Sequence, residues 1–236
     1  MLNNFTKLQL TQLANDMASG FSIVKYNHVL YLPVNYTTRQ FDPALTPEDR
    51  VWIPLPMQQV LNLASQTSKV MFYSEGEKSS FYGMVEQAAQ YATGTPGTVL
   101  LVKDGKLAEL RADGALHPPT HDFCPHFIAT PVNDDPDAKA GVLATMTEWL
   151  DDSEENAVSL LAHIATALAP HWSAVKYVLL IGEGRNGKSV LMKMILSLLG
   201  EHNISHVTRQ DMSASKSTCL DLQGRLANIV FDGPAS

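Results

Sequence analysis

The stretch YVLLIGEGRNGKSVLMKMILSLLG, residues 177–200, decides the fold expected for this chain. Its central part, GEGRNGKS from Gly182 to Ser189, fits the pattern GxxxxGK[ST]. The apolar run YVLLI precedes it and predicts a buried parallel strand. A helical pattern follows and ends at Gly200, with its apolar face formed by Leu191, Met194, Ile195 and Leu198. The order of strand, loop and helix predicts a phosphate-binding loop.

The residue types in this loop suit the binding of a nucleotide. Glycines let successive backbone N–H groups point inward as an anion cradle, and the following helix adds its positive end. We expect Lys188 to reach the β- and γ-phosphates and Ser189 to bind Mg²⁺, so ATP and Mg²⁺ are the expected cofactors. The expected nucleotide contacts are Gly182, Glu183, Gly184, Arg185, Asn186, Gly187, Lys188 and Ser189. The alternative is a glycine-rich turn that binds no ligand.

A second acidic element is expected near the loop. LANIVFD, residues 226–232, is an apolar strand-like run that ends in Asp232, which is the arrangement of a Walker B motif. Asp232 would hold Mg²⁺ together with Ser189, and Lys188 and Asp232 are the expected catalytic residues. Gly233 stands where many such enzymes have a catalytic Glu, so the sequence identifies no base that activates water.

The segment 182–200 resembles the Walker A region of superfamily 3 helicases, specifically the phage, satellite-phage and poxvirus-type primase-helicases. Asn186 is the distinguishing residue within the loop. LQGRLANIVFD, residues 222–232, resembles their Walker B region, with Arg225 in place of the usual Lys. Residues 105–138 resemble the segment before the ATPase but lack an aromatic residue of its "P-V-x-[YF]-D-P-x-A" element. The resemblance covers roughly Thr98 to Asp232.

This resemblance implies a fold and an activity. The implied fold class is a partial α/β P-loop NTPase core, AAA+-like with a parallel sheet, over residues 173–236, preceded by a helical domain over 134–172. The implied function is the ATPase part of a phage or viral replicative helicase that couples ATP hydrolysis to translocation on single-stranded or forked DNA. The implied partners are further copies of the chain in a homo-hexamer and a primase or the remainder of a split helicase.

Residues 1–133 predict an α+β region. The expected helices are Phe5 to Ser19, Met57 to Ser65 and Phe81 to Tyr91, and strands are expected within 23–32. Asp104-Gly105 predicts a hairpin over 98–110. Further on, a helix is expected from Asp137 to Leu150. Ser153 is expected to cap the next helix, whose apolar stripe would be Val158, Leu161, Ile164, Ala165 and Leu168.

Composition indicates a folded, globular chain, because 45% of its 236 residues are hydrophobic and 17% are charged. The net charge is −7, and residues 134–155 carry eight acidic groups against one basic group. Bulk charge therefore gives no argument for nucleic-acid or membrane binding. No apolar stretch approaches about 18 residues and no signal peptide is evident, so we expect no membrane partner and a cytoplasmic location, in the host cell if the protein is viral.

Three further groups of residues could bind a metal or a base or act as a nucleophile, but a structural role is favoured for each. His117, His121, Cys124 and His126 lie close together in sequence, but the intervening prolines favour an ordinary connector over a zinc site. Cys219 is expected to be a buried helix residue. Core packing is preferred over base stacking for Tyr26, Tyr31, Phe72, Tyr73, Phe81 and Tyr82.

Three hypotheses for function stay open at this point. Only four residues follow Asp232, and they hold no sensor and no arginine finger, so we expect an incomplete motor from a split or truncated reading frame. A hydrolysis-deficient module that binds ATP or a partner helicase is the alternative to the helicase. A small-molecule P-loop kinase is disfavoured because only Arg209 and Arg225 follow Gly187 and the loop lacks the GxxGxGK[ST] form.

Overall fold

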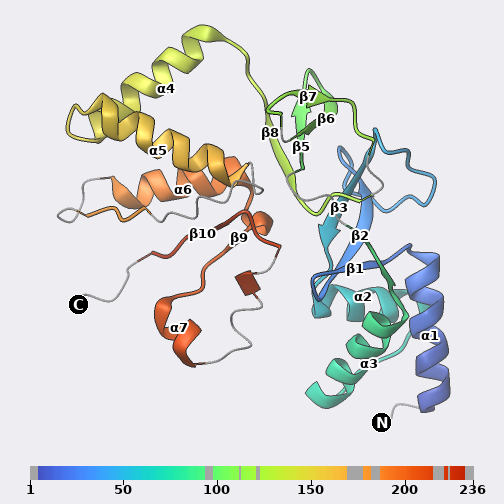
Figure 1. The fold of residues 1–236 in the computed structure, drawn as a ribbon. Helices are drawn as coiled ribbons and strands as arrows, with labels where there is room; N and C mark the ends of the chain where they lie inside the picture. Colours follow the sequence, from blue (N-terminus) through green and yellow to red (C-terminus); the bar gives the residue numbers. More distant parts are fainter. Residues whose placement is uncertain are drawn as a thin grey trace. The chain divides into compact units, whose positions relative to one another are not determined.

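The computed structural model of the chain describes residues 5–93, 98–111, 113–120, 123–168, 178–181, 187–214, 221–222 and 224–231. The chain divides into two compact units (Figure 1). The first comprises residues 1–94 and 121–125, and the second comprises residues 95–120 and 126–236. The sequence analysis placed its first boundary after residue 133, whereas this division falls after Gly94 and assigns the hairpin to the second unit.

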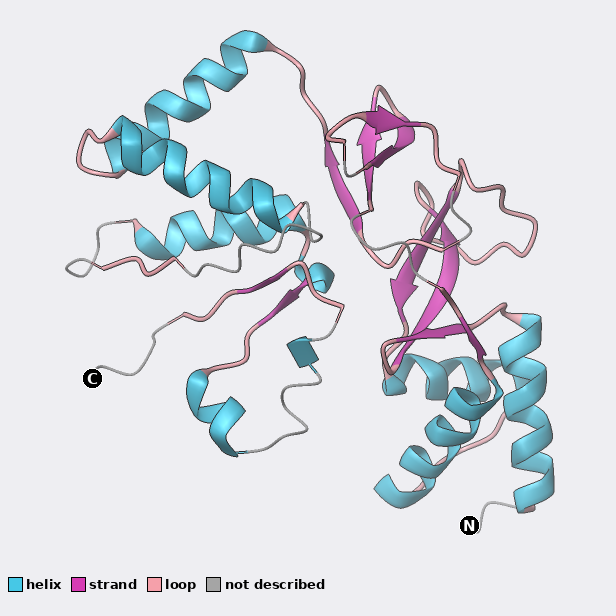
Figure 2. Cartoon of the chain, viewed as in Figure 1, coloured by secondary structure: helices cyan, strands magenta, loops and turns pink. Residues whose placement is uncertain are grey.

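The described part of the first unit contains three helices and a four-stranded sheet. Its elements are α1 (Lys7–Gly20), β1 (Val24–Tyr26), β2 (Val29–Asn35), β3 (Arg50–Pro54), α2 (Met57–Ser68), α3 (Glu75–Ala88) and β4 (Gln90–Tyr91). The strand order is β3-β2-β1-β4, and only the pairing of β1 with β4 is parallel. The helices gather at one side of the sheet (Figure 2).

Two helix starts in this unit are fixed by reciprocal capping. Thr6 accepts a hydrogen bond from the backbone of Gln9, and the side chain of Gln9 bonds back to the backbone of Thr6. At α3 the hydroxyl of Ser74 accepts from the backbone N–H of Glu77, and the carboxylate of Glu77 accepts from the backbone N–H of Ser74. A capping box satisfies two N–H groups that a helix start leaves without partners. The expected helix over 81–91 therefore begins earlier than predicted, at Glu75.

An aromatic cluster packs in the first unit, with Tyr31, Trp52 and Phe123 all buried. The ring centroids of Tyr31 and Trp52 each lie 5.3 Å from that of Phe123, in edge-to-face geometry that aromatic pairs prefer. The expectation of core packing is confirmed for Tyr31 and for Phe81, which is fully buried. It is wrong for Tyr73, which is 56% exposed at the start of α3.

The second unit carries two further sheets and four helices in its described part. Its elements are β5 (Val99–Lys103), β6 (Lys106–Leu110), β7 (Leu116–His117), β8 (Phe127–Pro131), α4 (Pro136–Trp149), α5 (Glu154–Ala167), α6 (Lys188–Leu199), the 3-10 turn η1 (Glu201–Asn203), β9 (Ile204–Ser205), α7 (Arg209–Ala214) and β10 (Ala227–Asn228). One sheet has the order β7-β6-β5-β8, and the other pairs β9 with β10 in parallel. The expected hairpin is confirmed, with Asp104 and Gly105 at positive φ.

Helices α4, α5 and α6 pack around one small core of Met146, Ala157, Leu160 and Leu191. Ser153 caps α5 as predicted, because its hydroxyl accepts from the backbone N–H of Asn156 at 3.2 Å. The apolar stripe predicted for α5 is displaced around the helix, since Ala157 and Leu160 are buried while Val158 is half exposed. The apolar face predicted for α6 also differs from the buried one. Leu191 and Leu199 are buried, while Met194 and Leu198 are 44% and 41% exposed.

A second core of this unit joins α6 to the two sheets, through Val99, Leu101, Ile128, Leu199 and Ile204. Buried Asn203 connects α6 with β8, because its side-chain amide donates to the carbonyls of Leu199 and Phe127 at 2.8 and 2.9 Å. A buried amide group is costly unless it finds such partners. Asn203 therefore holds the end of α6 against the start of β8.

Two expected strands differ from the structure. Residues 178–181 form no strand, and Leu179 and Ile181 are 70% and 84% exposed. A parallel strand needs a paired neighbour, and the two parallel pairs in the second unit's described part, β5 with β8 and β9 with β10, do not include this run. The strand expected over 226–232 is reduced to Ala227–Asn228 within the residues described. The fold is thus a mixed α/β arrangement with small mixed sheets.

No helix in the described ranges is long and apolar enough to cross a membrane.

Candidate functional site

The start of helix α6 is the structural centre of the candidate site. The helix begins at Lys188, immediately after Gly187, whose φ of 83° lies in the left-handed region that glycine adopts without a steric penalty. The carbonyl of Gly187 accepts from the N–H groups of Val190 and Leu191, each at 2.9 Å. Gly187 thus turns the chain directly into the first helical turn.

The electrostatic character of this helix start favours an anion. Among the described residues no side chain caps α6, and its first turn contains no acidic residue. In contrast, Ser153 caps α5, and Glu154 and Glu155 follow in its first turn. The positive end of a helix dipole attracts negative charge, and here Lys188 adds a cationic side chain at the same place.

A cleft of about 500 Å³ opens beside this helix start. Its walls come from the end of α4, the turn into α5, one side of α5, residues 178–181 and the first turn of α6. Figure 1 shows α5 and α6 lying side by side, and the shared contacts of Leu160 and Leu191 confirm this packing. The volume falls within the roughly 300–1,000 Å³ that small-molecule sites occupy.

Helix α5 contributes one regular row to the wall of the cleft, made of Asn156, Ser159, Leu160 and His163. This spacing of i, i+3, i+4 and i+7 places all four on one face of the helix. The imidazole Nδ1 of His163 lies 3.0 Å from the backbone carbonyl of Ser159. Trp149, at the last position of α4, also lines the cleft and is 42% exposed.

The predicted site residues fall into three groups. Gly187 and Lys188 line the cleft, as the phosphate-loop prediction requires. Ser189 lies in the first turn of α6 and is exposed, but it is not part of the cleft wall. Gly182, Glu183, Gly184, Arg185, Asn186 and Asp232 lie outside the described residues, as does Cys219. Their expected roles stay predictions.

Strand β10, which precedes Asp232, is held in place by a side-chain clasp. The Asn228 amide oxygen accepts from Ser205 Oγ and from the N–H of Val207, both at 2.9 Å, and its nitrogen donates to the carbonyl of Val207 at 2.9 Å. Asn228 and Ser205 are direct partners in the register of β9 and β10. These bonds hold β10 against β9 and the residues that follow it.

The other candidate residues do not gather at this cleft. His117 Nε2 lies 3.1 Å from a carboxylate oxygen of Asp113, Cys124 is buried in the first unit, and His126 is buried in the second. His121 lies outside the described residues. Among the described residues, no group of three or more His, Cys, Asp or Glu side chains is placed to hold a metal ion.

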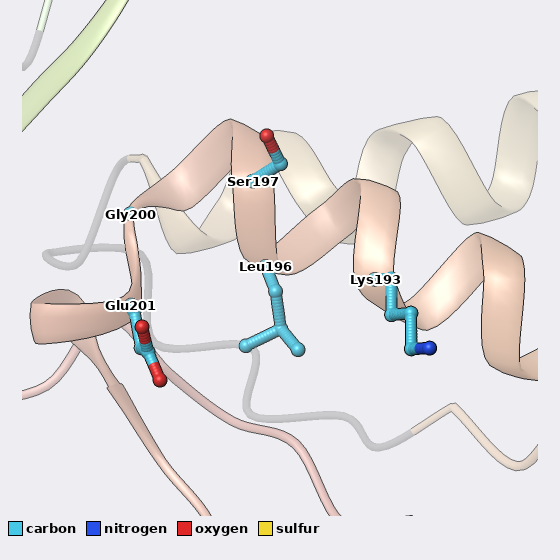
Figure 3. A pocket seen from close by; sticks show the side chains of 5 residues that line it. All are labelled: Lys193, Leu196, Ser197, Gly200 and Glu201. Atoms are coloured by element: carbon cyan, nitrogen blue, oxygen red, sulfur yellow. The ribbon is translucent and has the colours of Figure 1, made fainter.

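A smaller hollow of about 310 Å³ lies at the other end of α6. In Figure 3 the side chains of Lys193, Leu196 and Glu201 point to one side of the helix and that of Ser197 points to the other. It contains no residue of the predicted phosphate loop. The cleft at Lys188 is therefore the stronger candidate site.

The sequence analysis missed the wall of the cleft. Ser159, His163 and Trp149 were not proposed as site residues, although the polar row of α5 repeats at helical spacing. That signal was available in the sequence, but only the packing of α5 on α6 connects it with Lys188. No protein-family model and no curated protein sequence matches the chain.

Proposed function

We propose that the second unit binds Mg²⁺-ATP and is the ATPase portion of a replicative DNA helicase of the superfamily 3 type. The observation that carries this proposal is the start of α6 at Lys188, directly after left-handed Gly187 and at the edge of a cleft of about 500 Å³. This is the position that the GEGRNGKS pattern gives to the helix of a phosphate-binding loop.

The residues present at the cleft fit a nucleotide. The uncapped, acid-free first turn of α6 and the ammonium group of Lys188 would hold the phosphates. The cleft beside them has room for the nucleoside, and its walls combine apolar side chains such as Leu160 and Leu191 with a few polar groups. When bound, Mg²⁺ would neutralise phosphate charge, and Ser189 and Asp232 are the residues proposed to hold it.

The order of elements after Lys188 also supports the proposal. Helix α6 leads into β9, and a crossover containing α7 leads into β10, which pairs with β9 in parallel. Parallel neighbours joined by a helical crossover are the building unit of nucleotide-binding α/β folds. Asp232 follows β10 in the sequence, as a Walker B acid follows its strand. Residues 178–181 form no strand, so the support for the proposal comes from the elements that follow the loop and not from the one that precedes it.

The DNA-directed part of the proposal rests on the resemblance of the loop and of residues 222–232 to primase-helicases. It is tested by measuring ATP hydrolysis by the purified chain with and without single-stranded DNA. The proposal expects hydrolysis that rises on addition of DNA and disappears in Lys188→Ala. If hydrolysis requires Lys188 but does not change when DNA is added, the ATPase proposal stands and the helicase proposal is rejected.

One feature favours a second candidate, an ATP-binding module without turnover. Gly233 follows Asp232 where a second carboxylate would activate water. For such a module, wild type and Lys188→Ala would hydrolyse ATP equally slowly, while only wild type would bind it. The same hydrolysis assay, run beside a binding titration, separates the two candidates.

A further inference from the structure

The part of the cleft wall formed by α4 and α5 has the chemistry of a base-recognition surface. Trp149, Ser159 and His163 come from α4 and α5, outside the predicted phosphate loop, yet they line the same cleft as Lys188. A nucleotide whose phosphates lie at the start of α6 must place its base somewhere else in this cleft. Residues 178–181 add only apolar side chains to the wall, whereas α4 and α5 add the polar and aromatic groups that could recognise a base.

The hydrogen bond within α5 places a hydrogen on the Nδ1 atom of the His163 ring. The carbonyl oxygen of Ser159 can only accept, so the Nδ1 atom 3.0 Å away must carry the hydrogen and donate it. In the neutral ring the Nε2 atom is then left as an acceptor. Among the described residues, no other polar atom bonds to the His163 ring.

An acceptor at this position distinguishes between the two purines. Adenine carries an exocyclic amino group, which donates, where guanine carries the O6 oxygen, which accepts. His163 Nε2 can therefore accept from adenine, whereas it meets a second acceptor in guanine. Trp149 offers an aromatic face on which either base can stack, because stacking is tolerant of base identity.

We infer that His163, held by the Ser159 carbonyl, is the residue that selects adenine over guanine in the cleft beside Lys188. This inference rests on the proposed function, because it needs a nucleotide whose phosphates are bound at the start of α6. It adds a specificity-determining residue that lies on a different helix from the phosphate loop.

The test compares the binding of three probes, ATP, GTP and inorganic tripolyphosphate, to the full chain by calorimetric titration with Mg²⁺. Wild type is expected to bind ATP about tenfold more tightly than GTP, because one partly buried hydrogen bond contributes about this factor to the binding constant. His163→Phe is expected to lose this tenfold preference while binding tripolyphosphate as wild type does. His117→Phe, a matched histidine replacement outside the cleft, should change none of the three affinities.

A second variant covers the case in which His163→Phe fails to fold, as judged by circular dichroism and thermal melting. His163→Gln carries both an acceptor and a donor, so it should retain ATP binding, gain GTP binding and bring the two affinities together. An unchanged ATP-to-GTP ratio in the folded His163 variants would overturn the inference. If Lys188→Ala still weakened all three probes, the proposed function would stand; if Lys188→Ala changed none, the proposed function would fail with it.

Discussion

His163 of α5 and Lys188 of α6 line the same cleft, although a whole segment of chain separates the two helices in sequence. The packing of Leu160 against the cluster that contains Leu191 brings the two helices together. The shared cleft places the helix start proposed to bind phosphates beside polar and aromatic side chains of α4 and α5. The site is therefore a product of tertiary packing as well as of a sequence motif.

The packing between α5 and α6 can be tested with two leucines of the same helix. Leu191 is 4% exposed and Leu198 is 41% exposed. We expect Leu191→Ala to lower the free energy of unfolding by about 2–4 kcal/mol, through lost burial and the cavity that it leaves. Leu198→Ala should change it by about 0.5 kcal/mol or less. Urea denaturation measures both, and equal effects would contradict the assignment of the buried face.

The left-handed conformation of Gly187 makes a second prediction. Gly187→Ala should cost about 1–2 kcal/mol in stability because alanine is strained at a φ of 83°. It should also weaken nucleotide binding by displacing Lys188. Gly141→Ala is the matched control, because Gly141 lies within α4 and an added Cβ meets nothing within 4 Å at either position. The control should stabilise the helix by about 0.5–1 kcal/mol. Thermal melts that rank the two variants in the opposite order would contradict this account.

The buried His126 predicts a pH dependence of stability. Burial lowers the pKa of His126 to about 4, against a partial opposing effect of its hydrogen bond with Asn203, while His202 and Arg225 lower it further. The unfolded chain, with a histidine pKa of about 6.5, therefore takes up a proton first as the pH falls. The stability contributed by neutral His126 is complete above pH ~6.5 and is lost as the pH falls toward 4.

This loss should amount to about 2 kcal/mol between pH 7.5 and pH 5. Urea unfolding at the two pH values, compared between wild type and His126→Phe, isolates the contribution of this residue. Wild type should lose about 2 kcal/mol more than the variant over this range. An identical pH dependence in both proteins would show that His126 does not stay neutral in the folded state.

Trp149 provides an optical test of where the base binds. Because Trp149 lines the cleft, stacking of a purine against it should quench tryptophan fluorescence when ATP is added. Trp149→Phe should remove the change in fluorescence while leaving binding, measured by calorimetry, within about threefold of wild type, because phenylalanine still offers a stacking face. A change in fluorescence that persists in Trp149→Phe would place the base elsewhere.

Local signals in the sequence predicted much of the secondary structure. The helical pattern over residues 5–19 predicted α1, Asp104-Gly105 predicted the β5–β6 hairpin, and Ser153 predicted the start of α5. Each of these signals depends on neighbours in sequence, such as a cap or a turn with positive φ. The capping box of Ser74 and Glu77 is an equally local signal, and it places the start of α3 at Glu75 rather than at the expected Phe81.

Features that depend on distant neighbours were predicted less well. The apolar run 178–181 has the pattern of a buried strand, but no described strand pairs with it, and Leu179 and Ile181 are largely exposed. On α6, several apolar residues are compatible with more than one buried face, and only the packing against α5 and β8 selects Leu191 and Leu199. The contribution of His163 to the cleft was missed for the same reason.

The central claim is that the start of α6 binds the phosphates of ATP, and a calorimetric titration of Mg²⁺-ATP into wild type, Lys188→Ala and Lys193→Ala tests it most directly. Lys193 lies on the same helix but lines the separate hollow at its far end, so it is the matched control. The account predicts that Lys188→Ala weakens ATP binding at least tenfold, while Lys193→Ala binds as wild type does. ATP binding that is unchanged in Lys188→Ala would contradict the account.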